Sequence, residues 1–378
     1  MGKKLEFLQM LRGGAALVVM ISHLLIMFYL GNDAVSQSFP YLMQVVVDTV
    51  DFQFLSNINR IFIQVNLNLG AYGVAIFFLI SGFVISLSLE HKSVKDFVVK
   101  RLFRIWPTYV VGFSLTFLMI WFYTRAFNIE FPYNVKDYLI QISLLRDWFW
   151  KPSIDGVSWT LEVELKFYLV MCIIFYFRKA QNKHVVGMTC LILFLCNFFT
   201  NFLMDDLLTC HLILYRILNT IQFSNINILF MLLGVCVYNR YQKYWTSEEF
   251  IEMLVKIYLL LIFSVVFSVH KSTLQLYTSS YLFSLLTFLV GYIFRDRWKA
   301  FKFLNFFGEI SYPFYIVHGL NGYIIQNFLL QYHVKPYICF FIALTWAIIV
   351  AYVLHISIEK SSLLWFEKIK LKYFLSKS

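Results

Sequence analysis

The chain has 378 residues, of which 60% are hydrophobic and only 14% are charged. It contains 42 Phe and 24 Tyr, and its mean hydropathy is +0.70. A water-soluble domain cannot bury that much apolar surface, so the composition excludes a soluble globular protein and indicates an integral membrane protein. The net charge of +11 comes from 32 basic and 21 acidic residues, and its meaning depends on where the basic residues lie.

Apolar stretches close to the length of about 20 residues that spans a bilayer recur along the whole chain. They predict an all-α, polytopic integral membrane protein with about ten transmembrane helices. The first stretch follows Lys3-Lys4, as a signal peptide would, but it is too long and lacks a small-x-small cleavage pattern, so we expect it to be retained. The predicted spans are roughly 9–30, 71–89, 105–124, 161–177, 185–204, 225–239, 255–270, 278–294, 310–330 and 336–358.

The distribution of lysine and arginine predicts the orientation of these helices. Basic residues accumulate in loops on the cytoplasmic side of a membrane. If the N-terminus is inside, the cytoplasmic segments hold 23 Lys and Arg residues and the opposite loops hold eight. This asymmetry predicts ten helices with both termini in the cytoplasm. It also accounts for the net charge, so we expect no nucleic-acid partner.

Motifs for soluble catalytic chemistry are missing from the sequence. It contains no H-E-x-x-H, no P-loop and no G-x-S-x-G elbow, and its six cysteines have no C-x-x-C spacing. We therefore expect neither a metal site nor a disulfide framework. Residues 1–378 are expected to form a single transmembrane domain without a fused soluble domain, so any chemistry uses residues on or between the helices.

The first apolar segment contains two ionisable residues, Arg12 and His23, eleven positions apart. At about 1.5 Å of rise per residue they lie roughly 16 Å apart along one helix axis. An ionisable side chain at that depth in lipid is costly, so it is a functional hypothesis by default. The alternative is a histidine that only forms a hydrogen bond between helices.

The two long outer connections, residues 31–70 and 125–158, mix aromatic and polar residues and are candidate acceptor-binding surfaces. Aromatic faces beside carboxylates and amides suit a sugar ring, although aromatic belts also occur at the interface of any membrane protein. The polar and aromatic residues concerned are Asp33, Asp48, Asp51, Asn57, Asn59, Asn66 and Asn68 in the first connection, and Asp137, Asp147, Trp148, Trp150 and Asp155 in the second.

The second and third segments add a small-residue pair and a basic pair. Ser81-Gly82 would let a neighbouring helix approach closely. Arg101 and Arg104 lie three residues apart on one helix face, immediately before the chain enters the membrane. Two guanidinium groups can each grip phosphate oxygens in a bidentate manner, as a phosphate-rich cytosolic ligand requires. The alternative is ordinary positive-inside anchoring.

Two acids and a lysine precede the fourth segment at a boundary otherwise made of aromatic residues. Glu162 and Lys166 stand four residues apart, an orientation that favours a helical ion pair. Glu164 is left without a local partner and could orient a histidine from another helix. A structural cluster of ion pairs is the alternative. The ninth segment contains a second intramembrane histidine, His318.

In this order the segments resemble membrane-bound acyltransferase family 3, the polytopic enzymes that acylate sugars of bacterial polysaccharides. The resemblance covers nearly the whole chain, and its strength comes from five motifs in family order. The family patterns are L-R-G-x-A-A-x-x-V-x-x-x-H at Leu11 to His23, G-V-x-x-F-F-x-x-S-G-F at Gly73 to Phe83, R-x-x-R at Arg101 to Arg104, W-[ST]-L-x-[VI]-E-x-x-F-Y at Trp159 to Tyr168, and I-S-Y-x-x-Y-x-x-H at Ile310 to His318.

The chain departs from the family pattern at a few positions. Gly14 replaces the usual hydrophobic or small residue after Arg-Gly, which costs only helix propensity. Many relatives carry adjacent acids where this chain has Glu164-Leu165, so only Glu164 is carried over as a catalytic residue, and Glu162 is a weaker candidate.

The resemblance implies an acyl-CoA donor in the cytosol, most often acetyl-CoA, used as a cosubstrate with no permanently bound cofactor. Arg12, Arg101 and Arg104 would bind the donor's phosphates. His23, supported by Glu164, would either deprotonate the acceptor hydroxyl or form an acyl-imidazole. Supporting roles in the site fall to Ser81, Trp159, Glu162, Tyr168 and His318.

The leading hypothesis is therefore a multi-pass O-acetyltransferase of the bacterial inner membrane. Its acceptor would be a glycan or lipid-linked saccharide, such as O-antigen of lipopolysaccharide, a capsule, or a precursor of either. One alternative is a non-enzymatic saccharide flippase or transporter, and another is the same family with a succinyl or longer acyl group. Binding of CoA separates the enzyme from the transporter.

Overall fold

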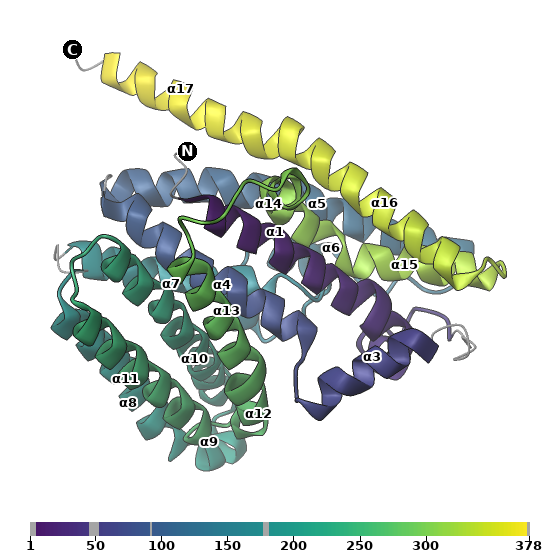
Figure 1. Cartoon of the computed structure of the whole chain (residues 1–378). Helices are drawn as coiled ribbons and strands as arrows, with labels where there is room; N and C mark the ends of the chain where they lie inside the picture. The colour runs from purple at the N-terminus through teal and green to yellow at the C-terminus, as the bar shows by residue number, and fades with distance from the viewer. Residues whose placement is uncertain (1–4, 45–52, 91–92, 177–180, 376–378) are drawn as a thin grey trace.

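A computed structural model of the chain describes residues 5–44, 53–90, 93–176 and 181–375 (Figure 1). These residues form helices and connecting segments, and none of them lies in a β-strand. The elements of the first half are α1 (Glu6–Ile21), η2 (Ser22–Leu30), α2 (Asn32–Ser38), α3 (Gln53–Gln64), α4 (Leu69–Glu90), α5 (Val94–Ala126), α6 (Val135–Ile142), η4 (Arg146–Phe149) and α7 (Trp159–Tyr176).

The second half is helical as well. Its elements are α8 (Lys183–Asn201), α9 (Met204–Cys210), α10 (Leu212–Tyr241), α11 (Ser247–Val266), η5 (Lys271–Thr273), α12 (Leu274–Leu276), η6 (Tyr277–Tyr281), α13 (Leu282–Ile293), α14 (Lys302–Val317), α15 (Gly319–Gln331), α16 (Pro336–Leu354), η7 (His355–Lys360) and α17 (Ser361–Leu375).

The helices confirm an all-α, polytopic membrane protein. Each of the ten predicted spans falls on one or more of them. Seven helical stretches in the described ranges are long and apolar enough to cross a bilayer by length and composition. The predicted total of ten crossings and the cytoplasmic placement of both termini stay predictions.

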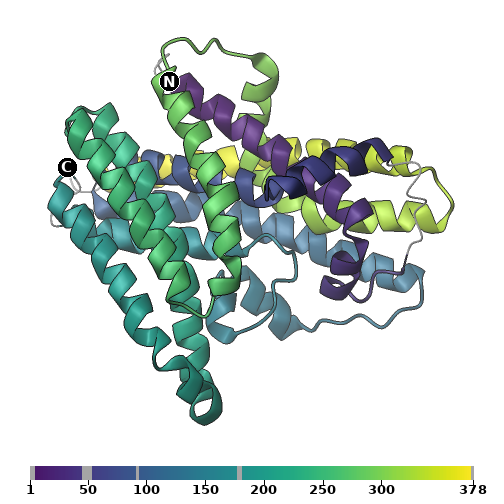
Figure 2. The same ribbon diagram turned by 60° about the horizontal axis from the view of Figure 1, so that its bottom comes forward.

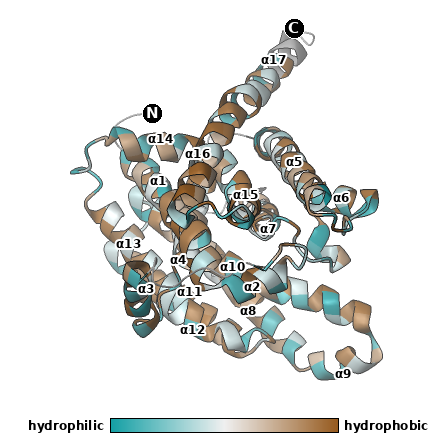
Figure 3. Ribbon diagram, turned by 90° about the vertical axis from the view of Figure 1, so that its right-hand side faces the viewer, coloured by the Kyte–Doolittle hydropathy of each residue, from teal (hydrophilic) through white to brown (hydrophobic). Residues whose placement is uncertain are grey.

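The outward faces of the helices are apolar, as lipid contact requires. On α11 the side chains of Ile251, Val255, Leu259 and Phe263 recur every four residues and are each about half exposed. Brown, the colour of hydrophobic residues, predominates along α16 in Figure 3, whereas teal is frequent on α3. Exposing such apolar stripes to water would cost free energy, whereas contact with the hydrocarbon chains of lipid does not.

The ninth predicted span, 310–330, is not one straight helix. It is divided between α14 and α15, with a bend at His318. Pro313 removes one backbone donor inside α14, and the His318 ring contacts the carbonyl oxygens of Phe314 and Tyr315 in the last turn. Side-chain contacts with these carbonyls mark the end of α14, so the bend is placed by the histidine as well as by the proline.

Two groups of helices flank α1 and α4. In Figures 1 and 2 the teal and green helices α8, α10 and α11 gather on one side, while α14, α15 and the long run of α16 and α17 lie on the other. The most extensive packing joins α4 to α10 and α1 to both α4 and α14. The middle layer therefore connects the two groups, and the predicted site residues of α1 and α4 lie within it.

Glycines allow the closest of these helix contacts. A Cβ atom on Gly82 of α4 would lie 2.1 Å from the carbonyl oxygen of Met231, and one on Gly234 of α10 would lie 2.2 Å from that of Leu79. Real Cβ atoms do not approach an oxygen so closely, so both positions need glycine. The close approach predicted at Ser81-Gly82 is confirmed, and α10 is the helix that makes it.

A second crossing joins α1 to α14 in the same way. A Cβ atom on Gly13 would lie 2.0 Å from the carbonyl oxygen of Leu304, and one on Gly308 would lie 2.5 Å from that of Gln9. Gly13 follows Arg12 directly, so this contact fixes the position of Arg12 relative to α14.

We expect Gly234→Ala to lower the midpoint of thermal unfolding in detergent micelles, because its methyl group would collide with backbone of α4 that cannot rotate away. Gly14→Ala is the matched control, since no atom lies within 4 Å of the added Cβ. A helix-interior Gly→Ala change without a clash gains roughly 0.5–1 kcal/mol. Equal midpoints for the two variants would contradict the backbone contact.

Candidate active site

The three arginines of the predicted donor site converge on one cavity of about 110 Å³. Arg12 comes from α1, and Arg101 and Arg104 are the eighth and eleventh residues of α5. Val84 and Ile85 of α4 contribute to its apolar wall. The polar side chains that share the lining include Ser81, Thr160, Glu164, Tyr168, Tyr312 and Tyr315.

Glu164 lies among the arginines and not beside His23. Its Oε1 accepts hydrogen bonds from Ser81 Oγ at 2.9 Å and from Tyr168 Oη at 2.6 Å. The support of a histidine that the sequence predicted for Glu164 is therefore corrected. The reason is packing, because α7 lies against α4, α5 and α10, whereas His23 lies on η2. Two donors hold this carboxylate in the cavity as a counter-ion to the arginines.

The arginine cavity has more positive than negative charge. Arg101 donates to Ser88 Oγ at 3.1 Å, and its guanidinium lies over the rings of Phe97 and Tyr168. Arg12 has no hydrogen bond or ion pair within the described ranges. With three guanidinium groups and one carboxylate on its wall, the cavity suits an anionic ligand.

The sequence analysis missed the acid that pairs with Arg104. Glu359 lies 3.4 Å from Arg104 Nε and accepts from His355 Nδ1 at 2.8 Å. Both residues come from the π-helical turn η7, more than 250 positions along the chain from Arg104. The only sequence signal was an acid and a histidine four residues apart at the end of an apolar segment. Arg104 therefore lines the cavity while its guanidinium is paired with the carboxylate of Glu359.

His23 and His318 contact each other, which the sequence did not predict. His23 Nδ1 lies 2.9 Å from His318 Nε2, and the two rings are within 5° of parallel. His318 is buried at 1% exposure, whereas His23 is half-buried. His23 stands at the start of the π-helical turn η2, and such turns are frequent at functional sites.

Tyr315 connects this histidine pair to the arginine cavity. Its side chain lines the cavity, and its ring lies 5.8 Å from that of His318 between centroids. Thr160 Oγ1 donates to the Tyr315 hydroxyl at 3.2 Å. The arginine cavity and the histidine pair are therefore neighbours, and Tyr315 contacts both.

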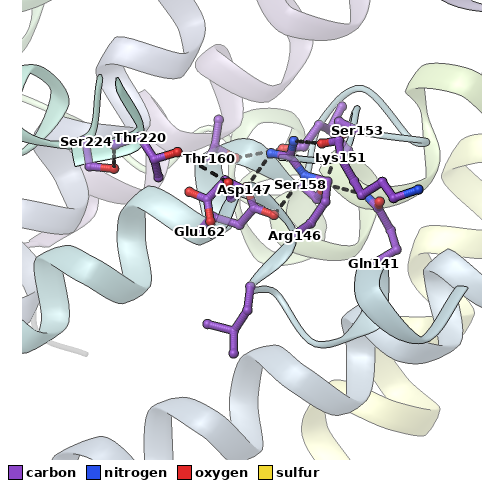
Figure 4. A network of polar contacts seen from close by, with 12 residues as sticks. Gln141, Arg146, Asp147, Lys151, Ser153, Ser158, Thr160, Glu162, Thr220 and Ser224 are labelled. Carbon is purple, nitrogen blue, oxygen red and sulfur yellow. Dashed lines mark hydrogen bonds and ion pairs between the residues drawn. The ribbon is translucent and has the colours of Figure 1, made fainter. Parts of the chain in front are cut away.

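Ion pairs tie the start of α7 to the loop before it (Figure 4). Arg146 donates from Nε and Nη2 to the two carboxylate oxygens of Glu162, and Lys166 pairs with Asp147. The expected ion pair between Glu162 and Lys166 is therefore wrong, because each finds a nearer partner in η4. Glu162 lies on this network, whose residues line a second cavity, and not in the arginine cavity.

Two larger cavities lie near the long connections. One, of about 480 Å³, lies beside the network of Arg146 and Glu162 and is walled by Trp150 and Trp159. Trp159 also packs edge-on against Phe78 and Phe223. The other cavity, of about 490 Å³, is lined by Ser22, which precedes His23, and by amides of Asn59, Asn66 and Asn68.

Several of the polar residues singled out in these connections stabilise the local backbone. Asp155 is buried and accepts the backbone N–H groups of Val157 and Ser158, which begin the turn into α7. Asp137 completes a capping box at α6. Asp48 and Asp51 lie outside the described residues.

A family model described as an acyltransferase domain matches residues 5–356. The chain belongs to this acyltransferase family. It is 33% identical over 111 residues to the acyltransferase MdmB of Streptomyces mycarofaciens, and 33% identical over 121 residues to nodulation protein 10 of Rhizobium leguminosarum bv. viciae. Each similarity covers 27% of this chain, and they cover 27% and 32% of those relatives. No solved structure matches the chain.

Membership of the family confirms the resemblance carried by the five motifs. The chain is a multi-pass membrane protein of this acyltransferase family, and its matches span only about a third or less of the two curated relatives. Membership of an acyltransferase family favours the enzyme over the saccharide transporter considered from the sequence.

We expect Arg146→Met to destabilise the protein by about 3–5 kcal/mol, because it leaves Glu162, 2% exposed, as an uncompensated buried charge. The midpoint of thermal unfolding in micelles measures the loss. The double variant Arg146→Met/Glu162→Leu should recover most of it, since both charges are then absent. Lys256→Met, which breaks an exposed pair with Glu252, is the control and should cost no more than about 1 kcal/mol. A loss equal to that control would contradict the network.

Proposed function

We propose that this acyltransferase moves an acetyl group from acetyl-CoA to a hydroxyl of a cell-envelope saccharide in the inner membrane of a bacterium. The observation that carries the proposal is the adjacency of an arginine cavity to a histidine pair, joined through Tyr315. The arginine cavity suits the phosphates of a CoA thioester, and the histidine pair can accept the proton of an alcohol. The proposal assigns both substrates to the one membrane domain of residues 1–378.

The chemistry of the cavity supports a CoA donor. Guanidinium groups bind phosphate oxygens in pairs, and Arg12 has no competing ion pair within the described residues. A volume of about 110 Å³ admits a chain-like group but not a nucleotide, so the adenosine end lies at the mouth. The apolar side chains of Phe77, Val84 and Ile105 suit the pantetheine arm that follows.

His23 is the proton acceptor of the proposed reaction. It removes the proton of the acceptor hydroxyl while the oxygen attacks the thioester carbonyl. The C–S bond then breaks, and the CoA thiolate takes the proton back from His23, so no net proton is consumed. The second route, through an acyl-imidazole on His23, uses the same residue and forms the same products.

The amide-lined cavity is the proposed place of the acceptor. It begins at Ser22, next to His23, and its asparagine amides can both donate to and accept from sugar hydroxyls. Two other residues of its lining, Ile26 and Met27, follow His23 along η2, on the side away from Arg12 in the chain. This arrangement suits donor and acceptor that reach the site from different sides of the membrane.

CoA should stabilise the purified protein against thermal unfolding, by about 2.7 kcal/mol at 100 times its Kd. Arg101→Met should lose most of this gain, because one of three phosphate-binding groups is removed. Lys302→Met, an exposed lysine at the start of α14, is the control and should respond as the unchanged protein does. Pantetheine, which lacks phosphates, should affect Arg101→Met and the unchanged protein alike. Failure of CoA to stabilise the unchanged protein would contradict the donor assignment.

Cells that express the unchanged chain should carry O-acetyl esters on their surface polysaccharide, measured by NMR, and cells without it should not. His23→Ala, at matched membrane levels, should abolish the esters because the proton acceptor is lost. Its stabilisation by CoA should persist, since the arginines are intact. Unchanged acetylation with His23→Ala would remove this histidine from the mechanism, and acetylation that does not depend on the chain would redirect the search to other acyl groups or acceptors.

A further inference from the structure

The histidine pair is a directed hydrogen bond and not a stack of rings. The ring centroids lie 5.0 Å apart while the facing nitrogens are 2.9 Å apart. The difference between these distances is close to twice the radius of an imidazole ring, so both nitrogens lie near the line that joins the centroids. Since the rings are within 5° of parallel, the N–H of one points at the in-plane lone pair of the other.

The backbone decides which nitrogen carries the hydrogen. His318 Nδ1 lies 3.0 Å from the carbonyl oxygen of Phe314 and 3.0 Å from that of Tyr315. A carbonyl oxygen can only accept, so Nδ1 of a neutral His318 must be the protonated nitrogen. Its Nε2 therefore carries a lone pair and accepts from His23 Nδ1–H.

The same logic leaves His23 with its lone pair on Nε2. Within the described ranges this atom has no hydrogen-bond partner, and it is not one of the fully enclosed polar atoms that lack one. Its lone pair is therefore uncommitted, and the atom keeps some accessible surface. On the Nδ1 edge of the ring, a Cβ on Gly319 would lie 3.8 Å from His23 Nδ1, which is an ordinary van der Waals contact.

We propose that His318 is a positioning residue that holds His23 in the Nδ1–H tautomer and directs Nε2 to the acceptor hydroxyl. This inference rests on the proposed function for the reaction, but the tautomers themselves do not depend on it. When His23 Nε2 takes the hydroxyl proton, the ring becomes cationic and its Nδ1–H bond to His318 strengthens. The proton on Nε2 then passes to the CoA thiolate, which restores the starting tautomer.

The last turn of α14 stabilises this transient charge. His318 is the C-cap of α14, and the carbonyls of Phe314 and Tyr315 belong to its final turn. Carbonyls at a helix C-terminus carry partial negative charge, which favours a nearby imidazolium. The histidines lie in an apolar interior where a cation is costly. The oriented carbonyls, acting through His318, therefore stabilise the imidazolium of His23, as a carboxylate does in sites that water can reach.

Nitrogen-15 NMR of histidine-labelled protein in lipid bilayers tests the tautomers directly. The chain has eight histidines, and the His23 and His318 signals are assigned as those lost in His23→Gln and His318→Gln. We expect protonated Nδ1 and unprotonated Nε2 in both residues of the unchanged protein. A protonated Nε2 on neutral His23 would overturn the proposal, whether or not the protein transfers acetyl groups.

Kinetics of acetyl transfer test the consequence. His318→Leu removes the acceptor of the His23 N–H and should lower kcat roughly 10²-fold or more, with KM for acetyl-CoA unchanged because the arginines are untouched. His318→Gln can place an amide oxygen where Nε2 stood and should recover kcat to within about tenfold of the unchanged enzyme. His184→Gln, an exposed histidine at the start of α8, is the control.

The outcomes separate the two proposals. Equal kcat for His318→Leu and the control would overturn the positioning role while leaving the acyltransferase intact. Equal losses of kcat in His318→Leu and His318→Gln, with both proteins folded, would also overturn it. In that case the hydrogen-bond acceptor that glutamine supplies would make no difference, as expected of a purely structural residue. Absence of acetyl transfer in the unchanged protein, with the expected tautomers present, would contradict the proposed substrates and not the histidine pair.

Discussion

Backbone contacts at four glycines hold the centre of this protein together. At Gly82 and Gly234, and again at Gly13 and Gly308, a carbonyl oxygen of the neighbouring helix occupies the place of a Cβ atom. Helices in a bilayer gain little from the hydrophobic effect, so such close packing supplies much of their association. The spacing of α1, α4, α10 and α14 is thereby set by backbone, which tolerates little adjustment.

The polar residues of the site depend on this spacing. Arg12 precedes Gly13, and Ser81 precedes Gly82, so each is placed by the crossing beside it. The same crossing of α1 with α14 leads along both helices to the two histidines, one at the end of each. Because an unpaired polar group is costly in an apolar interior, each must meet its partner within hydrogen-bond distance. A small shift between α1 and α14 would separate His23 from His318.

The arrangement keeps charge and proton transfer in separate compartments. The arginines and Glu164 form one polar cluster, held by Ser81 and Tyr168. The histidines form another, in which each other and backbone carbonyls are the hydrogen-bond partners of the two rings among the described residues. Tyr315 stands at the junction. In the proposed reaction a neutral histidine away from the guanidinium groups can act as a base, whereas a carboxylate beside it would compete with the phosphates of the proposed donor for the arginines.

The sequence by itself determined the class of the protein, the apolar stretches that become helices, the family, and six polar residues of the arginine cavity. Composition and apolar periodicity are local properties, and each of the five family motifs is a short stretch that can be recognised without knowing the fold. The partners of these residues were decided only by the tertiary structure. Glu164 joins the arginines, Glu162 and Lys166 turn to Arg146 and Asp147, and His318 meets His23 across 295 positions of chain. Hydrogen bonds and ion pairs reach only a few ångströms, so they follow the packing of helices that are distant in sequence, and no spacing along the chain encodes that distance.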